Sequence, residues 1–374
     1  MLKVLKKSNK SYARLARLKT PHGEIDGPFF MTIATAGAVK TLDTEKMRRL
    51  SAPILLANTY HLYLRPGTDL IQKAGGLHRF MNWDKPILTD SGGYQVFSLA
   101  KMREIQEKGV FFQSHLDGSR HLLSPEKSIE VQLKLGSDIL MVLDECAPQT
   151  ETRDYIQKSL ELTTRWAKRS KVYFDANHEF FRYAGLGKPL CFGIIQGGSH
   201  LDLRVQSLNQ ITEIPFDGFA IGGVSVGEPQ EETRAVIEHI APRMPEDKPR
   251  YVMGVGFPEE LVFGVKQGVD MFDCVIPTRH ARHGSLFVFQ DRDQIGKGDF
   301  YKKVNIKNEE HKESFEPLDL NCACLVCQNY SKAYLRYLFH IGEMLGFRLA
   351  TIHNVFFYLE LMDLIREKIK RDEF

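Results

Sequence analysis

Eight short apolar runs, separated by helix-like stretches, constrain the fold of this chain more than any other feature. The runs lie near residues 29–34, 54–57, 87–89, 139–143, 192–195, 219–221, 251–255 and 271–276. The helical patterns lie near 43–50, 67–74, 125–136, 152–172, 200–212, 229–241, 258–267 and 351–370. Continuous runs of Ile, Val, Leu and Phe are typical of strands buried on both faces. The alternation predicts an α/β protein built as a (β/α)8 TIM barrel. A doubly wound open sheet is the alternative, disfavoured because no GxGxxG turn follows an early strand.

Two segments depart from the alternation. Residues 109–123 contain FFQSHLDGSRHLL, which predicts a β-hairpin around Asp117-Gly118. Residues 285–349 hold an apolar run, a polar stretch and a cysteine cluster, and are interpreted as a subdomain inserted before the last helix. The predicted division is therefore 1–284 for the barrel with its catalytic face, 285–349 for the insertion, and 350–374 for the final barrel helix.

Composition narrows the class of protein. A chain of 374 residues with 43% hydrophobic and 26% charged residues can bury a large core. It has no run of eighteen apolar residues, and its start lacks the features of a secretory signal, so we expect a cytoplasmic protein. Net charge is +3, although the first twenty residues carry seven Lys or Arg, and a second basic cluster occupies 168–171. Such clusters are usually solvated surface and merely permit a polyanionic partner.

Polar residues follow nearly every apolar run. Asp90, Asp144 and Gln196 each come directly after one, Asp273 follows Met271-Phe272 at the start of the last run, and glycine pairs follow two of the runs. In a barrel these points meet at the carboxyl-terminal face, where active sites of this fold lie. A single Asp at such a point is usually a helix cap, but three Asp, a Gln and two Gly-Gly pairs are hard to explain as caps.

The residue types at these points favour carboxylate chemistry. No strand end offers a histidine-rich set for a catalytic metal, a phosphate-binding Gly-Lys-Ser/Thr loop, or a hydrolase motif. One Asp could then attack while another moves protons. Gly197-Gly198 and Gly222-Gly223 would let backbone approach a flat ligand, with Tyr94 and Met253 as its faces, although Met253 could equally be a core residue.

Three cysteines, Cys322, Cys324 and Cys327, have the spacing CxCxxC of a metal site. A tetrahedral Zn²⁺ needs a fourth ligand, and His340 and His353 both follow at plausible distances. Spacing does not choose between them. Three thiolates and an imidazole leave no open position, so the predicted site is structural.

Together these motifs resemble the tRNA-guanine transglycosylase family in its bacterial single-chain form. The similarity extends from about residue 12 to 370. The matching segments are DSGGYQVFSL at 90–99, HLDGS at 115–119, SDILMVLDEC at 137–146, GIIQGG at 193–198, GFAIGGVSVGE at 218–228, YVMGVG at 251–256, GVDMFDCVIPTRHARHG at 268–284, and CxCxxC with a later His.

The resemblance implies a role for each matched residue. Asp273 would be the nucleophile on ribose C1′, and Asp90 the general acid/base. Arg279 and Arg282 would contact RNA near the anticodon loop. The zinc ligands would be Cys322, Cys324, Cys327 and His353, one structural Zn²⁺ per subunit. The residues implied to bind the base are Asp144, Gln196, Gly223, Tyr94, Ser91, Met253, Cys146, Asn58 and Val226.

The implied reaction is a double displacement through a covalent ribosyl-aspartate. Guanine 34 of tRNAs with a GUN anticodon (Asp, Asn, His and Tyr) would be exchanged for 7-aminomethyl-7-deazaguanine in queuosine biosynthesis. The extruded base would enter a pocket, and the resemblance also implies a homodimer. Cys146 and Val226 match the bacterial pattern for 7-aminomethyl-7-deazaguanine. His280 and His283 replace the Asn residues of the family's usual PTRNARNG loop.

Three alternatives stay open at this point. The incoming base could be queuine. The chain could be a non-catalytic tRNA-binding subunit, although Asp273 is present with its whole motif. It could also be a metal-dependent barrel hydrolase, which would stay active after Asp273→Ala.

Overall fold

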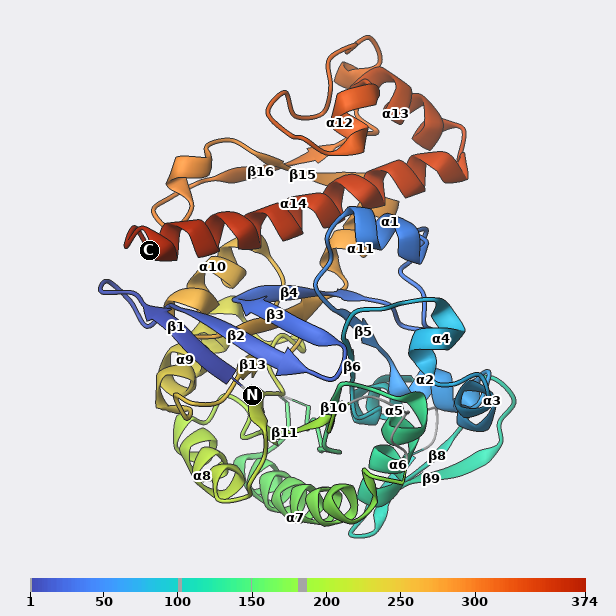
Figure 1. The fold of residues 1–374 in the computed structure, drawn as a ribbon, viewed down its shortest axis with the longest axis vertical. Helices are drawn as coiled ribbons and strands as arrows, with labels where there is room; N and C mark the ends of the chain where they lie inside the picture. The colour runs from blue at the N-terminus through green and yellow to red at the C-terminus, as the bar shows by residue number, and fades with distance from the viewer. Residues whose placement is uncertain (1, 100–102, 149, 181–186) are drawn as a thin grey trace.

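The protein, described here by a computed structural model, is built around a closed barrel of eight parallel strands (Figure 1). The structure describes residues 2–99, 103–148, 150–180 and 187–374. Parallel pairing runs round the whole barrel and closes where Met271 of β14 lies opposite Phe29 of β4. Closure excludes the open doubly wound sheet and confirms the barrel prediction. The barrel strands are β4 (Phe29–Ile33), β5 (Leu55–Ala57), β6 (Ile87–Thr89), β10 (Ile139–Met141), β11 (Leu190–Ile195), β12 (Gly218–Ile221), β13 (Arg250–Val252) and β14 (Met271–Cys274).

Helices follow the barrel strands along the chain and cover the barrel from outside (Figure 1). Capping explains several of their ends. Helix α6 begins after Ser124, whose hydroxyl accepts from the Lys127 N–H, and ends at Gly136 in the left-handed conformation. The helices of this part are α1 (Thr44–Arg49), α2 (Thr59–Leu64), α3 (Thr68–Lys73), α4 (Leu77–Met81), α5 (Gly93–Leu99), α6 (Pro125–Leu135), α7 (Arg153–Asn177), α8 (Leu201–Thr212), α9 (Gln230–Ile240), α10 (Pro258–Lys266) and α11 (Ile276–Arg282).

The last helix, α14 (Met344–Lys370), begins earlier than the expected residue 351. In the structure a side chain at Gly346 would come within 2.9 Å of Leu338 Cβ, so this glycine allows close contact between α14 and α13 (Lys332–His340). The segment before α14 also contains β15 (Ser285–Phe289), β16 (Tyr301–Asn305) and α12 (Leu325–Asn329).

This C-terminal segment shares a hydrophobic core with the first helices of the barrel. Its Leu286, Val326 and Leu335 belong to one buried cluster with Leu62 and Ile71. The segment is therefore packed on the barrel through apolar side chains and does not stand apart from it.

A three-stranded antiparallel sheet precedes the barrel and was not expected from the sequence. It consists of β1 (Leu2–Lys7), β2 (Arg14–Thr20) and β3 (Gly23–Gly27). Exposure alternates along β1 and β2, as in strands with one face covered. Arg14 pairs with Asp270 just before β14, and His22 pairs with Asp138 just before β10, so the sheet covers the amino-terminal end of the barrel.

The predicted hairpin is present and forms part of a three-stranded sheet. It joins β8 (Gly109–Gln113) to β9 (Arg120–Leu123), and β7 (Arg103–Gln106) pairs with the other side of β8. Gly118 supplies the positive φ of the turn, at 74°. Within the described residues, no helix is long and apolar enough to cross a membrane.

Candidate active site and metal cluster

Three aspartates lie at the carboxyl-terminal ends of barrel strands. Asp90 follows β6, Asp144 lies just beyond β10, and Asp273 is the last residue but one of β14. Asp90 is influenced electrostatically by both other carboxylates. Among the residues that the structure describes, no Lys, Arg or His side chain forms a salt bridge with any of the three. The barrel thus brings together three carboxylates without a neutralising cation.

Asp90 is held by the chain that follows β5. Its Oδ1 accepts from the Thr59 N–H at 2.9 Å and from the Gly92 N–H at 3.2 Å, while Asn58 Nδ2 donates to Oδ2. Burial raises the pKa of Asp90 to about 7; the backbone donors oppose this rise, and the Asp273 and Asp144 carboxylates add to it. Near neutral pH Asp90 can therefore give or take a proton, as a general acid/base must.

Asp273 is oriented by two donors from the neighbouring strand β13 and the turn after it. The Tyr251 hydroxyl and the Gly254 N–H, the latter at 3.0 Å, both donate to Oδ1. Burial raises the pKa of Asp273, and these two hydrogen bonds oppose the rise. Both donors engage the same oxygen of the carboxylate.

Asp144 lies between two polar side chains from adjacent strand ends. Ser91 Oγ donates to Oδ1 at 3.3 Å, and Gln196 Nε2 donates to Oδ2 at 2.6 Å. Burial raises the pKa of Asp144 to about 6, against the effect of these donors. At neutral pH the carboxylate is mostly ionised, and it can accept hydrogen bonds from a ligand.

The two glycine pairs have different surroundings. A Cβ at Gly223 would lie 2.3 Å from Gln196 Oε1, so only glycine lets this backbone approach the Gln196 amide. A Cβ at Gly197 would instead lie 2.8 Å from the backbone nitrogen of Arg204 in α8. The Gly222-Gly223 pair therefore borders the carboxylate cluster, whereas Gly197 allows the loop after β11 to pack closely on α8.

The remaining predicted ligand-binding residues lie on the same loops with different exposure. Tyr94 is 50% exposed on α5, and Met253 is partly buried against the main core. Cys146 is partly buried, and burial raises the pKa of its thiol to about 12, so the thiol is neutral. Val226 donates its N–H to Glu228 at 2.9 Å.

The predicted RNA-binding arginines lie on α11, directly after Asp273. Arg279 is exposed, whereas Arg282 is partly buried and donates to the Thr278 carbonyl at 2.8 Å. His280, one of the two departures from the family loop, does not face solvent with them. Its ring stacks on Phe287 with centroids 5.6 Å apart. The substitution at 280 is thus directed into an aromatic core, while His283 is exposed.

The basic clusters of the sequence are largely engaged within the protein. Arg14 forms a buried salt bridge with Asp270 at 2.7 Å. In the 168–171 cluster, Arg169 pairs with Glu126 and Lys171 with an acidic residue one turn away. These clusters contribute to packing between elements, which accounts for much of the charge seen in the sequence.

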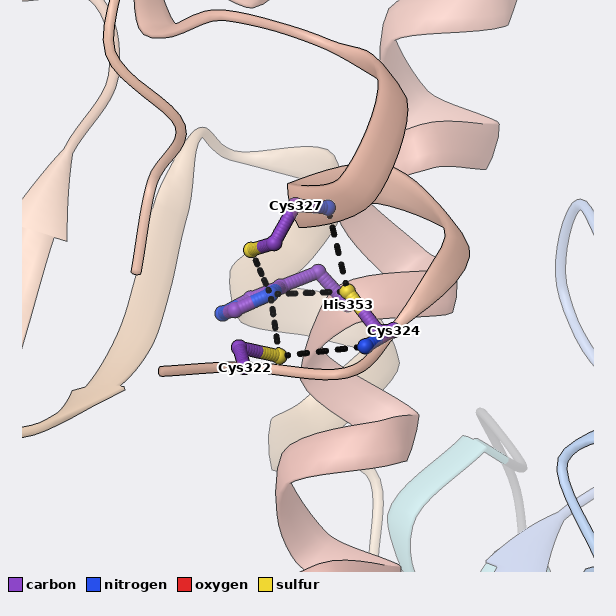
Figure 2. Close-up of side chains that lie close together, drawn as sticks. All are labelled: Cys322, Cys324, Cys327 and His353. Carbon is purple, nitrogen blue, oxygen red and sulfur yellow. Dashed lines mark hydrogen bonds between the residues drawn. The ribbon is translucent and has the colours of Figure 1, made fainter. Parts of the chain in front are cut away.

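The three cysteines and His353 form one buried cluster (Figure 2). His353 Nδ1 lies 3.5 Å from the sulfurs of Cys324 and Cys327 and 4.0 Å from that of Cys322. His353 Nε2 lies 2.7 Å from the Phe287 carbonyl, which fixes Nε2 as the protonated nitrogen and leaves the Nδ1 lone pair facing the sulfurs.

This arrangement could hold a metal ion. Three sulfurs and one imidazole nitrogen are a donor set that suits tetrahedral coordination, and the residues are buried. His340, the alternative fourth ligand, is exposed at the end of α13 and outside the cluster. Tertiary structure thus decides between two histidines that spacing could not separate.

Two residues of the site were missed at the sequence level. Tyr251, which donates to Asp273, reads as an ordinary apolar strand residue. Arg204 lies in the first turn of α8, and its buried guanidinium donates to carbonyls of the loops after β11 and β12. A sequence does not distinguish a buried arginine from a solvated one, so no pattern could have identified it.

Fold and site together define a class: a (β/α)8 barrel with three carboxylates gathered at the carboxyl-terminal ends of its strands, where enzymes of this fold have their active sites. The profile of the family described as Queuine tRNA-ribosyltransferase matches residues 8–374. A queuine tRNA-ribosyltransferase of Halothermothrix orenii is 52% identical over 360 residues, covering 96% of this chain and 91% of that protein. Its namesake in Solidesulfovibrio magneticus is 52% identical over 362 residues, covering 97% and 92%. The chain belongs to the queuine tRNA-ribosyltransferase family, and it is an enzyme of the pentosyltransferase class.

Proposed function

We propose that this enzyme exchanges guanine 34 in tRNAs with a GUN anticodon for 7-aminomethyl-7-deazaguanine. The observation that carries the proposal is the convergence of Asp90, Asp144 and Asp273 on one face of the barrel. The names of the relatives support the reaction class, since they describe ribosyl transfer on tRNA.

In the first half of the reaction, a carboxylate oxygen of Asp273 attacks C1′ of the ribose. The C1′–Oδ bond forms as the C1′–N9 bond breaks, and guanine leaves with a proton supplied by Asp90. In the second half, the incoming base gives its N9 proton to Asp90, and N9 displaces the carboxylate from C1′. The roles suit the site, because Tyr251 and Gly254 hold one oxygen of Asp273, and Asp90 has a pKa of about 7.

Recognition of the base would use complementary hydrogen bonds. The Asp144 carboxylate accepts from N1–H and the 2-amino group, while Gln196 and the Gly223 N–H donate to O6. Ser91 and Asn58 hold the two carboxylates in place, and Cys146 and Val226 border the part of the pocket that receives the 7-substituent. Tyr94 and Met253 would stack on the two faces of the base.

The tRNA would be bound by arginines beside the active site. Arg279 and Arg282 on α11 would bind phosphates near the anticodon loop.

A homodimer is proposed because exposed apolar side chains gather on α13 and the start of α14, where a second copy would cover them. These side chains are Tyr334, Tyr337, Ile341, Met344 and Leu345. A mass measurement in solution at micromolar concentration decides the point, since a monomer would contradict it.

Exchange of radiolabelled guanine into tRNA-Tyr, competed separately by 7-aminomethyl-7-deazaguanine and by queuine, tests the central reaction. We expect incorporation that the first competitor blocks at lower concentration than queuine does. Failure to label any GUN-anticodon tRNA would overturn the proposed function, and stronger competition by queuine would reverse the proposed base preference.

The cysteine and histidine cluster is proposed to hold one structural Zn²⁺, with no part in the exchange chemistry. His353→Ala should lose the bound metal and lower the melting temperature strongly, because binding of such an ion stabilises the fold by as much as ~10 kcal/mol. The matched control is His340→Ala, which should keep one zinc per chain by elemental analysis. Equal zinc content in both variants would contradict the assignment.

A further inference from the structure

The side chain of Arg204 connects the loop that follows β11 to the loop that follows β12. Its side chain is 0% exposed, and its guanidinium donates to four carbonyl oxygens. Nε donates to Gly198 at 2.7 Å, Nη1 to Ile195 at 3.0 Å and to Gly222 at 2.6 Å, and Nη2 to Gly223 at 2.9 Å. The acceptors lie at and beyond the ends of β11 and β12. One side chain therefore joins the two loops that carry Gln196 and Gly223, the residues proposed to recognise the base.

This buried guanidinium has an unusual set of partners. Within the described parts of the chain it forms no salt bridge, whereas the buried Arg14 pairs with Asp270 at 2.7 Å. Burial lowers the pKa of Arg204 to about 10, so it remains charged at neutral pH. Burying a cation without a carboxylate is costly, and a neutral apolar residue would avoid that cost. The four hydrogen bonds therefore call for an explanation beyond filling space.

Peptide geometry supplies this explanation. In a planar trans peptide the C=O and the following N–H point in opposite directions. Because the Gly222 carbonyl is turned toward Arg204, the Gly223 N–H is turned away from Arg204. The Ile195 carbonyl is held in the same way, and the following N–H of Gln196 donates to Ser207 Oγ at 3.0 Å. Arg204 thus sets the peptide planes that carry both proposed donors to the base.

We propose that Arg204 is a positioning residue for base recognition: by holding these carbonyls, it fixes the direction of the Gly223 N–H and the backbone that carries the Gln196 side chain, so that both can donate to O6 of a guanine or 7-deazaguanine base. The inference rests on the proposed function, in which Gly223 and Gln196 read O6. It assigns to Arg204 no contact with the substrate. Its effect is to fix in advance two donors that would otherwise have to be ordered when the base binds.

The test compares Arg204→Lys with a matched control, Arg250→Lys. Arg250 is also buried and donates to backbone carbonyls, Nη2 to Met244 at 2.5 Å and Nε to Pro245 at 3.3 Å, but it lies at the start of β13, at the other end of the barrel. Guanine exchange into tRNA should show KM for guanine raised about tenfold or more in Arg204→Lys, with KM for tRNA unchanged, since one oriented hydrogen bond is lost. Arg250→Lys should lose a similar amount of thermal stability and leave KM for guanine unchanged.

Two further measurements separate positioning from simple destabilisation. Inhibition by 2-aminopurine, which lacks the C6 oxygen, should be the same in wild type and Arg204→Lys, while inhibition by guanine weakens. Hydrogen exchange should accelerate at residues 196–200 and 222–226 and not at 254–256. If the lysine variant does not fold, Arg204→Gln, which retains one donor, takes its place with the same expectations.

An unchanged KM for guanine in a folded Arg204 variant would overturn the inference, as would equal weakening of guanine and 2-aminopurine. A wild-type enzyme that fails to exchange guanine would instead overturn the proposed function, so the two failures are distinguishable.

Discussion

The two ends of the barrel surround the same residue type with different partners. Asp138, Asp217 and Asp270 each lie just before a barrel strand, and Asp90, Asp144 and Asp273 lie at strand ends. At the amino-terminal end, Asp270 has a buried salt bridge with Arg14, and Asp217 accepts from a backbone N–H at 2.9 Å. At the carboxyl-terminal end, the described residues offer the carboxylates only neutral donors.

The pKa values express this difference. Burial alone would raise the pKa of Asp138, but hydrogen bonds from His22 and His78 outweigh burial, and its pKa is lowered. Burial raises the pKa of Asp90 to about 7 and of Asp144 to about 6, because no cation opposes it. A paired carboxylate stabilises the fold, and an unpaired one can accept or donate a proton. The comparison teaches that the partners of a buried aspartate, and not its burial, decide the direction in which its pKa is shifted.

The largest expected effect is at Asp273. Asp273→Asn should lower the rate of guanine exchange by roughly 10⁴-fold or more, because the attacking oxygen is lost. No covalent adduct with tRNA should appear on a denaturing gel, and the melting temperature should not fall. Substantial exchange in this variant would remove Asp273 from the role of nucleophile.

Asp90→Asn should lower the same rate by about 10²–10⁴-fold, the usual contribution of a general acid/base. In wild type we expect a bell-shaped pH profile. The rate falls at low pH as Asp273 becomes protonated, because its pKa is raised. It falls again as pH rises through about 7, where Asp90 loses the proton needed by departing guanine. The apparent values belong to the coupled carboxylates as a group.

The Asp90→Asn variant provides the control for the pH profile of the exchange rate. Its residual rate should lack the alkaline limb, since no proton on residue 90 remains to be lost. An alkaline limb that persists unchanged in Asp90→Asn would assign it to another group.

The third prediction concerns the opposite end of the barrel. Asp270→Asn should destabilise the protein by about 3–5 kcal/mol in urea unfolding, because Arg14 is left buried without its partner. Its kcat at low temperature should stay near the wild-type value. A large loss of kcat in the folded variant would show that the two ends of the barrel are not separate in function.

The smallest effect is expected at an exposed Arg–Asp salt bridge, which serves as the control for the buried Arg14–Asp270 pair. Arg17 and Asp26 lie 2.7 Å apart on the surface of the amino-terminal sheet. Asp26→Asn should leave the urea concentration at the midpoint of unfolding nearly unchanged, because solvent screens an exposed pair. An effect as large as that of Asp270→Asn would mean that burial does not set the strength of these pairs.

By itself the sequence determined the barrel, its eight strands and the three aspartates at their ends, because apolar runs and the residues that follow them are local patterns. The hairpin at Gly118 was determined in the same way, by turn chemistry. The prediction that Cys322, Cys324 and Cys327 form a metal site was also local, because these cysteines lie close together along the chain.

Only tertiary structure decided which partners these residues meet. His353 and not His340 joins the cysteines, because α14 passes beside their loop. Arg14 and Arg204 look like surface charges in the sequence, and both are buried, one against a carboxylate and one against four carbonyls. The pKa values of the three strand-end aspartates depend on the same long-range contacts. Burial and pairing arise between segments far apart in the chain, so no local pattern could have contained them.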